Sequence, residues 1–266
     1  MHLLALHGFT GRGADFAPLR AALGERHGIA TAPIAWHSPD LPGHGPSPQL
    51  DCGPAAMATF VQARRSLFDP GPPSPKVLLG YSMGARAALL HATAEPEAWD
   101  ALILVSPNPG IEDESERSAR RRSDADLAER IERDGVEAFL AFWQEQALIR
   151  SQQRIPSPHR EAMRANRLAH TSAGLAASLR QFGQGSFPNL WPELPKLKTP
   201  VILVTGGEDE KYTAIARRMQ ALLPKALHLE IDSSGHAPQL EASVPLAHEL
   251  AARLSPESLH GLGKRP

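Results

Sequence analysis

The sequence predicts an α/β fold in which helices cover both faces of a mostly parallel β-sheet. Short apolar runs of strand length recur along the chain, and each is apolar on both faces, as buried parallel strands are. These runs alternate with stretches that have the pattern of crossover helices. A long stretch between two of the strands has no strand pattern at all. This third observation predicts a helical insertion in the sheet.

The strand and helix patterns can be placed along the chain. Strands are expected at 3–6, 29–36, 77–79, 101–105, 201–205 and 227–231. Crossover helices are expected at 54–68, 84–94, 212–223 and 244–254. Residues 69–75 contain four prolines, which cannot continue a helix, so this segment is predicted to be a loop.

The region from 110 to 194 is predicted to be a helical cap. It contains three helical stretches, at 115–133, 136–148 and 158–180. Ligands of parallel sheets bind beyond the carboxyl ends of the strands, so helices inserted there would cover a binding site. We therefore expect a core made of 1–109 and 195–254, a cap at 110–194, and a flexible, Gly- and Pro-rich tail at 255–266.

Composition and charge exclude several classes of protein. Hydrophobic residues make up 42% of the chain and charged residues 21%, and the formal net charge is −1, so neither a nucleic acid nor an anionic membrane is expected as a partner. Cys52 is the single cysteine, so no internal disulfide can form. No apolar run approaches the roughly 20 residues that span a bilayer, and the first residues do not resemble a signal peptide. A soluble, cytoplasmic protein is expected, and its oligomeric state stays open.

Ser82 is the candidate nucleophile. Residues 80–84 (GYSMG) match the pattern G-x-S-x-G, and they follow an expected strand and open a helix rich in alanine and leucine. This is the context of a nucleophile elbow, a strained turn that needs small neighbours and presents the serine at the edge of the sheet. The alternative is a glycine-rich turn that contains a serine by chance.

Asp209 and His236 are the candidates for the other two members of a catalytic triad. A serine hydroxyl becomes reactive when a histidine takes its proton, and an acid orients that histidine. In the fold that carries the nucleophile elbow, the chain order is serine, acid, histidine. Asp209 follows the strand at 201–205, and His236 follows the strand at 227–231. The alternatives are one of the glutamates that flank Asp209, and a surface role for His236.

An oxyanion hole is expected beside the triad. In such sites one backbone N–H comes from the residue after the nucleophile, here Met83, and one from a loop after an early strand, here Phe9. His7 and His44 are expected to hold loops in shape. The histidines lack the spacing of metal ligands and the chain has no CxxC motif, so neither a metal nor a cofactor is expected.

Several motifs resemble known proteins. Residues 7–11 (HGFTG), 40–45 (DLPGHG) and 80–84 (GYSMG) resemble those of α/β-hydrolase-fold proteins. Narrower stretches resemble the MenH family, the 2-succinyl-6-hydroxy-2,4-cyclohexadiene-1-carboxylate synthases of menaquinone biosynthesis: 116–124, 127–131, 135–143, 174–179, 207–212, Arg167 and Trp191. The resemblance covers 3–254. It implies a lyase that eliminates pyruvate from a substrate with several carboxylates, with Ser82 acting as a base.

The resemblance also implies which residues bind the substrate. Arg86, Arg120 and Arg167 match the family's arginines, whose guanidinium groups suit carboxylates, and Tyr81 and Trp143 match its aromatic contacts. Arg86 lies four residues after Ser82 on one helix and so faces the same way. Taken alone, the arginine run at 120–122 is typical of a solvated helix face, and a tryptophan is more typical of a core.

Two other functions remain open from the residues. A serine hydrolase, such as an esterase, a thioesterase or a carbon–carbon bond hydrolase, would use the same triad with Ser82 as a covalent nucleophile. A receptor or scaffold could also share the fold. The chain departs from the family's pattern at Ala85 and Asn108, and the strands that usually precede the first motif are missing, so we expect a smaller sheet with an exposed edge.

Overall fold

The computed structural model describes residues 1–26, 34–46, 48–70 and 74–254. Its centre is a six-stranded sheet in the order β2-β1-β3-β4-β5-β6, in which every pair of neighbours is parallel. The strands are β1 (His2–Leu6), β2 (Ala35–His37), β3 (Lys76–Tyr81), β4 (Ala101–Val105), β5 (Val201–Gly206) and β6 (Ala226–Ile231). The predicted α/β fold with a parallel sheet is confirmed.

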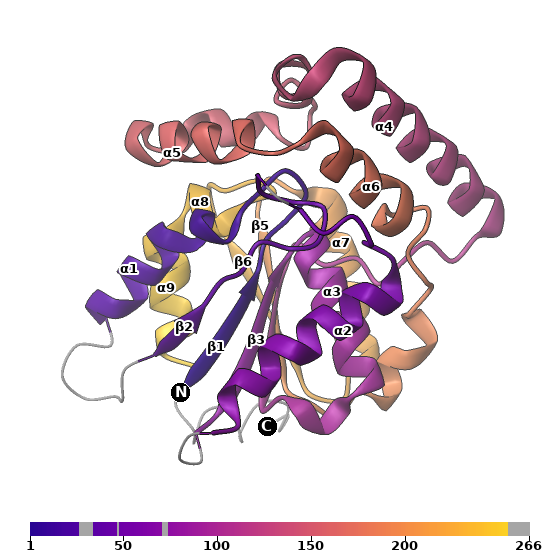
Figure 1. Ribbon diagram of the computed structural model, residues 1–266. Coiled ribbons are helices and arrows are strands. Elements are labelled where there is room, and N and C mark those ends of the chain that lie inside the picture. The colour runs from indigo at the N-terminus through magenta and orange to yellow at the C-terminus, as the bar shows by residue number, and fades with distance from the viewer. Residues whose placement is uncertain (27–33, 47, 71–73, 255–266) are drawn as a thin grey trace.

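Helices cover both faces of the sheet (Figure 1). One face carries α1 (Ala17–Arg26) and α9 (Ser243–Ala251), and the other carries α2 (Pro54–Arg65), α3 (Met83–Ala94) and α7 (Glu210–Leu222). Side chains of successive strand residues point to opposite faces. In β1, Leu3 and Ala5 therefore join the core under α1 and α9, while Leu4 and Leu6 join the core under α2 and α3. This double burial explains why the strands are apolar throughout.

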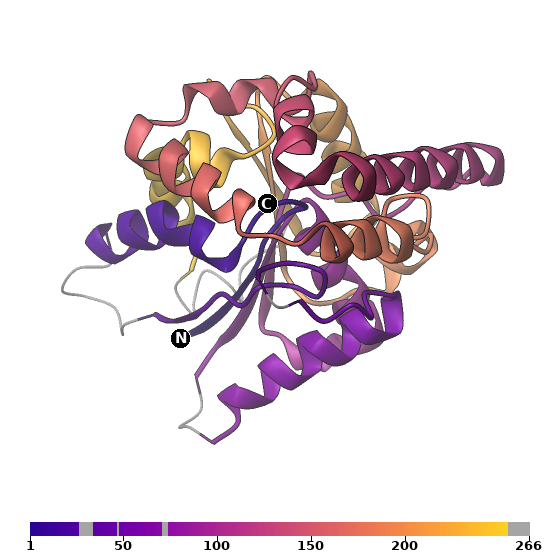
Figure 2. The ribbon, with the colours of Figure 1, turned by 45° about the horizontal axis from the view of Figure 1, so that its top comes forward.

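Three helices of the region between β4 and β5 lie over the carboxyl ends of the strands (Figures 1 and 2). They are α4 (Glu114–Trp143), α5 (Ser157–Leu168) and α6 (Ser172–Phe182). α4 and α6 pack against each other through a small apolar core that includes Ile131, Phe139 and Leu175. Within the part of the chain that the structure describes, no helix is long and apolar enough to cross a membrane.

The structure corrects three of the predicted elements. The strand predicted at 29–36 is only β2 at 35–37; residues 29–33 lie outside the described residues. The helix predicted at 158–180 is two helices, α5 and α6. Thr171 is the N-cap of α6, because its side-chain oxygen accepts the backbone N–H of Gly174. The helix predicted at 136–148 ends at Trp143.

Some elements were not predicted, and one predicted segment is not described. α1, α8 (Pro238–Glu241) and four short 3₁₀ helices were missed; the latter are Gly13–Phe16, Pro96–Ala98, Arg150–Arg154 and Trp191–Lys196. The 3₁₀ helix Ser66–Phe68 continues α2 within the helix predicted at 54–68. α8 is only four residues long, too short for a periodic pattern. The tail predicted at 255–266 lies outside the described residues.

Candidate active site

Ser82 occupies a strained turn between β3 and α3. Its backbone has φ 51° and ψ −106°, a conformation that residues other than glycine rarely adopt. Two close approaches explain the glycines on either side. A Cβ atom on Gly80 would lie 2.3 Å from the carbonyl oxygen of Gly84, and one on Gly84 would lie 2.0 Å from that of Leu6. The turn therefore fits the chain only with glycine at both positions.

The structure brings Ser82, His236 and Asp209 together. The Nε2 atom of His236 lies 3.1 Å from Ser82 Oγ, and its Nδ1 atom lies 2.7 Å from Asp209 Oδ2. Because a carboxylate only accepts, the proton of the neutral imidazole is assigned to Nδ1, which leaves the Nε2 lone pair facing the serine hydroxyl. Asp209 is fixed in turn, since its Oδ1 accepts the backbone N–H of Tyr212 at 3.2 Å.

Glu241 fixes the loop that carries His236. Its carboxylate accepts the N–H of Gly235 at 2.7 Å and the N–H of Ala237 at 3.0 Å, one on each side of the histidine. The hydroxyl of Ser106 donates to the carbonyl of His236 at 2.8 Å. Glu241 lies in α8, which the sequence analysis did not predict, so no local signal pointed to this role.

Two backbone N–H groups are free beside Ser82. Phe9 and Met83 both line its pocket, and neither N–H donates to an acceptor within the described ranges. Met83 is the first residue of α3, where backbone N–H groups have no partner in the helix. The two groups expected to form an oxyanion hole are thus available to a ligand.

Two neutral histidines hold the loop that carries Phe9. His7 Nε2 accepts the N–H of Leu41 at 2.9 Å, so its Nδ1–H donates to the carbonyl of Gly8. His170, which comes from the segment between α5 and α6, accepts the N–H of Gly45 at Nδ1 and donates from Nε2 to the carbonyl of Thr10. Burial lowers the pKa of His7 to about 4 and also lowers that of His170. Uncharged imidazoles therefore connect the loop both to the core and to the helices above it.

His44 completes this cluster of rings. Its ring packs edge-on against His7, with 4.8 Å between ring centroids, and edge-on against Phe9 at 6.0 Å. Burial lowers its pKa well below the ordinary histidine value. His7 and His44 both touch the loop of the candidate oxyanion hole and not the triad.

A pocket of about 310 Å³ opens above the triad, between the carboxyl ends of the strands and the helices that cover them. Of the predicted site residues, Tyr81, Arg86, Arg120 and Trp143 line it together with Ser82 and His236. Polar residues that the sequence analysis did not single out also line it: Ser123, Gln146, Ser178, Gln184, Lys211 and Tyr212. The pocket thus combines a nucleophile, a base and several cations.

Arg86 is a buried cation in this pocket. Its side chain is 7% exposed, Nη2 donates to the carbonyl of Phe182 at 2.9 Å, and Nε has no partner within the described residues. Burial lowers its pKa to about 10, which leaves it charged near neutral pH. Arg86 forms no ion pair with a carboxylate among the described side chains, because the nearby carboxylate of Asp124, which acts on it electrostatically, is paired with Arg120. An anionic ligand would supply a counter-ion.

Arg120 reaches the pocket from α4. Its Nε donates to the buried carboxylate of Asp124 at 2.7 Å, and its Nη1 donates to Gln184 Oε1 at 2.8 Å. These two contacts hold the guanidinium in place. The run of three arginines is therefore not uniform, because Arg120 lines the pocket while Arg122 is exposed.

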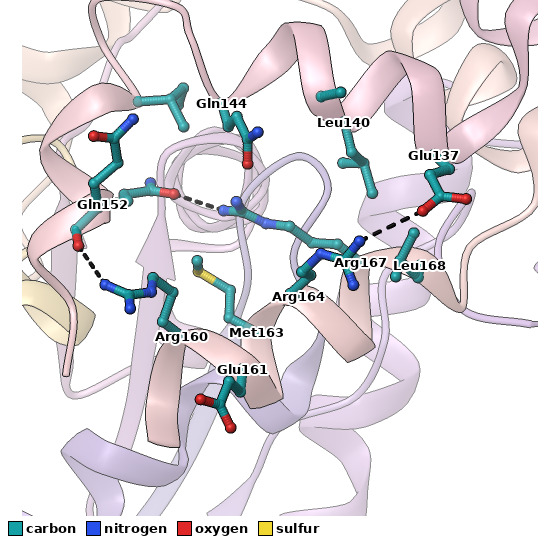
Figure 3. Close-up of a pocket in the computed structure, with 13 residues that line it drawn as sticks. Glu137, Leu140, Gln144, Gln152, Arg160, Glu161, Met163, Arg164, Arg167 and Leu168 are labelled. Atoms are coloured by element: carbon teal, nitrogen blue, oxygen red, sulfur yellow. Dashed lines mark hydrogen bonds and ion pairs between the residues drawn. The ribbon is translucent and has the colours of Figure 1, made fainter. Parts of the chain in front are cut away.

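Arg167 lies outside the pocket of Ser82. It projects into a neighbouring pocket of about 320 Å³ between the end of α4 and α5, where its Nη2 donates to Gln152 Oε1 at 2.7 Å (Figure 3). The position follows from the docking of α5, because Asn166 next to Arg167 donates to Asp15 at 2.7 Å. The two pockets share Ile149, and Gln152 also approaches the hydroxyl of Tyr81 at 3.5 Å. Arg167 was predicted at the same site as Arg86, but it lines the neighbouring pocket instead.

Comparison with known proteins was made at the level of the family, the sequence and the structure. The model of the alpha/beta hydrolase family matches residues 3–249. A putative 2-succinyl-6-hydroxy-2,4-cyclohexadiene-1-carboxylate synthase of Bacillus subtilis (strain 168) is 35% identical over 90% of this chain and 85% of its own length. The synthase of Enterobacter sp. (strain 638) is 32% identical over 85% of this chain and 84% of its own length.

Among solved structures, MenH from S. aureus superposes with a TM-score of 0.83 at 29% sequence identity, covering 95% of this chain and 92% of its own. The family match includes the elbow, the region between β4 and β5 and the loops of Asp209 and His236, and the identities and the superposition extend over most of the chain. The chain belongs to the alpha/beta hydrolase family and, within it, to the family of 2-succinyl-6-hydroxy-2,4-cyclohexadiene-1-carboxylate synthases.

Proposed function

We propose that this enzyme eliminates pyruvate from 2-succinyl-5-enolpyruvyl-6-hydroxy-3-cyclohexene-1-carboxylate to give 2-succinyl-6-hydroxy-2,4-cyclohexadiene-1-carboxylate, a step of menaquinone biosynthesis. One observation carries the proposal: a serine activated by a histidine opens into a pocket that also holds the buried, unpaired cation Arg86. A neutral ester would not need such a cation. The names of the two related synthases support the same reaction.

The proposed chemistry begins with removal of a proton from carbon. In the substrate, the ring C–H next to the succinyl ketone is acidic, because its carbanion is an enolate. Ser82 Oγ takes this proton while its own proton passes to His236 Nε2, and Asp209 stabilises the imidazolium. The enolate oxygen would lie in the hole formed by the N–H groups of Phe9 and Met83. Collapse of the enolate shifts the ring double bond and breaks the C–O bond to the enolpyruvyl group, which leaves as the enolate of pyruvate. This enolate takes up a proton at its methylene carbon to become pyruvate, and loss of the proton held by His236 restores the neutral triad.

We propose that different arginines bind different carboxylates of the substrate. Arg86 and Arg120 would hold carboxylates in the pocket of Ser82, with Tyr81 and Trp143 packing against the carbon skeleton. Arg167 would contribute from the neighbouring pocket, which shares Ile149 with the pocket of Ser82. We propose that residues 110–194 act as the cap that closes over this small-molecule substrate. The cytoplasmic location expected from the sequence stays a prediction.

The test is an assay of pyruvate release from the enolpyruvyl substrate, run beside hydrolysis of a p-nitrophenyl ester. We expect release of pyruvate by the wild-type protein and loss of release in Ser82→Ala. Arg120→Ala should lower kcat/KM by about ten- to hundredfold, the effect of losing a hydrogen bond to a charged group. Arg122→Ala is the matched control, since Arg122 is an exposed neighbour that does not line the pocket.

Ester hydrolysis without pyruvate release would contradict the proposed reaction. The same triad would then serve a hydrolase, with Ser82 attacking a carbonyl and forming a covalent acyl-enzyme. An equal loss of activity in the Arg120 and Arg122 variants would contradict the proposed role of Arg120, because it would indicate a general effect of lowering the positive charge.

A further inference from the structure

A chain of hydrogen bonds runs along one wall of the Ser82 pocket. It begins at the carboxylate of Asp124, which accepts from Arg120 Nε at 2.7 Å. Arg120 Nη1 donates to Gln184 Oε1 at 2.8 Å, and Gln184 Nε2 lies 2.8 Å from the hydroxyl oxygen of Tyr212. Tyr212 is the last member, and it lines the pocket together with Ser82 and His236.

The direction of donation along this chain is determined by its first member. A guanidinium group can only donate, so the amide atom of Gln184 that faces Arg120 must be the oxygen. The other amide atom is then the NH₂ group, which donates to Tyr212. The tyrosine hydroxyl is therefore an acceptor toward Gln184, and its own proton remains to be donated elsewhere.

That proton has no protein acceptor within the described residues. Tyr212 is 3% exposed, and Gln184 is the one hydrogen-bond partner of its hydroxyl there. A buried donor without an acceptor is unfavourable, so the hydroxyl is suited to an acceptor in the pocket. Three charged groups act electrostatically on Tyr212. The guanidinium groups of Arg86 and Arg120 can only donate, and the carboxylate of Asp209 accepts from His236 Nδ1 and from the backbone N–H of Tyr212 rather than from its hydroxyl. A carboxylate of a ligand in the pocket would supply an acceptor for this proton.

We propose that Tyr212 is a substrate-binding residue whose hydroxyl donates to the carboxylate held by Arg86 and Arg120, and that Gln184 is the positioning residue that sets this direction of donation. The inference rests on the proposed function for the identity of the anion. The ring of Tyr212 packs edge-on against His236, with 4.4 Å between centroids, so a change from tyrosine to phenylalanine retains the ring contact and removes the hydroxyl alone.

Two substitutions should remove the same donor in different ways. Tyr212→Phe deletes the hydroxyl. Gln184→Glu keeps it but reverses its direction, because a carboxylate at 184 would accept from both Arg120 and the tyrosine. Each variant should lower kcat/KM for pyruvate release by about ten- to hundredfold, mainly through KM. The double variant should lose no more than either single variant, since both act on one proton.

Gln146→Glu is the matched control. Gln146 lines the same pocket, and its side-chain amide donates to the carbonyl of Phe142 and does not contact Tyr212. A glutamate there therefore adds the same charge away from the tyrosine hydroxyl. Adding Tyr212→Phe to Gln146→Glu should still cost about ten- to hundredfold. Adding it to Gln184→Glu should cost less than about twofold, within the usual additivity error.

A binding measurement separates this inference from the proposed reaction. The affinity for succinate, measured by the fluorescence of the protein's tryptophans, should weaken in Tyr212→Phe and Gln184→Glu whether or not pyruvate release is observed. Succinamide, which has the same skeleton without charge, should bind equally to all variants. The inference is overturned if Tyr212→Phe changes neither succinate affinity nor kcat/KM, or if its cost is the same in the Gln184→Glu background as in the wild type.

Discussion

At the scale of single residues, we expect the buried charge of Arg86 to destabilise the folded protein and to strengthen the binding of an anionic substrate. Taking a charge out of water is unfavourable, and here no carboxylate of the described residues forms an ion pair with the guanidinium, although Asp124 acts on it electrostatically. The position nevertheless lies one helical turn past Ser82 and faces the same pocket. A charge kept in such a place is suited to a ligand that brings the opposite charge.

Arg86→Met should therefore separate activity from stability. We expect kcat/KM for pyruvate release to fall by about a hundredfold while the free energy of unfolding stays level or rises, because an unpaired buried charge is replaced by an apolar side chain. Urea denaturation and the pyruvate assay measure the two quantities. A parallel loss of both would indicate that Arg86 is mainly structural through its contact with Phe182.

The lowered pKa of Arg86 adds a pH test of the same role. The cation is present below a pH of about 10 and is lost as the pH rises through that value. KM for the anionic substrate should therefore rise between pH 9 and 11 in the wild type. Arg86→Met has no proton to lose at this position, so this rise in KM should be absent from its profile.

His7 provides a test of the buried histidines that hold the oxyanion loop. Its pKa is lowered to about 4 from 6.5, so between these values the unfolded chain binds a proton that the folded chain does not. The free energy of unfolding should fall as the pH is lowered through this window, and His7 can account for up to about 3 kcal/mol of that fall. In His7→Gln this part should be missing.

Urea denaturation at several pH values between 7 and 4 measures the difference. His248→Gln, at an exposed histidine of α9, is the matched control and should follow the wild type. Equal pH slopes for the wild type and His7→Gln would contradict the assignment of His7 as a neutral, buried connector.

At the scale of elements, the strand-turn-helix unit at Ser82 was predictable because its constraints are local. One continuous stretch of sequence contains the buried apolar strand, the two glycines around the strained serine and the alanine-rich helix. The helices above the pocket were less predictable. Periodicity indicated helices there, but the break at 169–171 depends on the cap formed by Thr171, and the end of α4 depends on packing against α6.

Gly135 shows how one residue shapes an element. It interrupts α4 with φ 82° and ψ 167°, a combination available almost only to glycine, although a Cβ there would meet nothing within 4 Å. Gly135→Ala should lower the free energy of unfolding by about 1–3 kcal/mol through backbone strain alone. The matched control is Gly24→Ala in α1, where a Cβ also has open space but the backbone is helical. There alanine should stabilise by about 0.5–1 kcal/mol.

The midpoints of urea denaturation compare the two glycine variants directly. We expect the midpoint to fall for Gly135→Ala and to rise for Gly24→Ala. Two stabilising changes would contradict the strain assigned to Gly135 and would indicate that α4 relaxes into a continuous helix.

At the scale of the whole molecule, the fold could be predicted from the sequence, and so could the meeting of the loops of Ser82, Asp209 and His236 at one end of the sheet. The order of Ser82, Asp209 and His236 along parallel strands is sufficient for this, since the carboxyl ends of such strands meet at one edge. It could not place Arg167, because the pocket that receives this side chain depends on how α5 docks on the segment of Asp15.

The polar network at the pocket wall was also beyond sequence reasoning. Gln184 lies in a loop without any motif, and the role of Tyr212 follows from the orientation of an amide that another residue determines. Such roles arise from contacts between segments that are distant in the chain. The roles of Gln184 and Tyr212 therefore follow from the donors and acceptors that surround them in the folded protein.

The central claim is that Ser82 removes a proton from carbon. Single-turnover release of pyruvate, from substrate carrying hydrogen or deuterium at the ring carbon next to the succinyl ketone, tests it most directly. If Ser82 and His236 remove this proton, the deuterated substrate releases pyruvate more slowly, and Ser82→Ala releases it from neither substrate. Equal rates for the two substrates, accompanied by a covalent adduct on Ser82, would contradict the claim and assign the triad to acyl transfer.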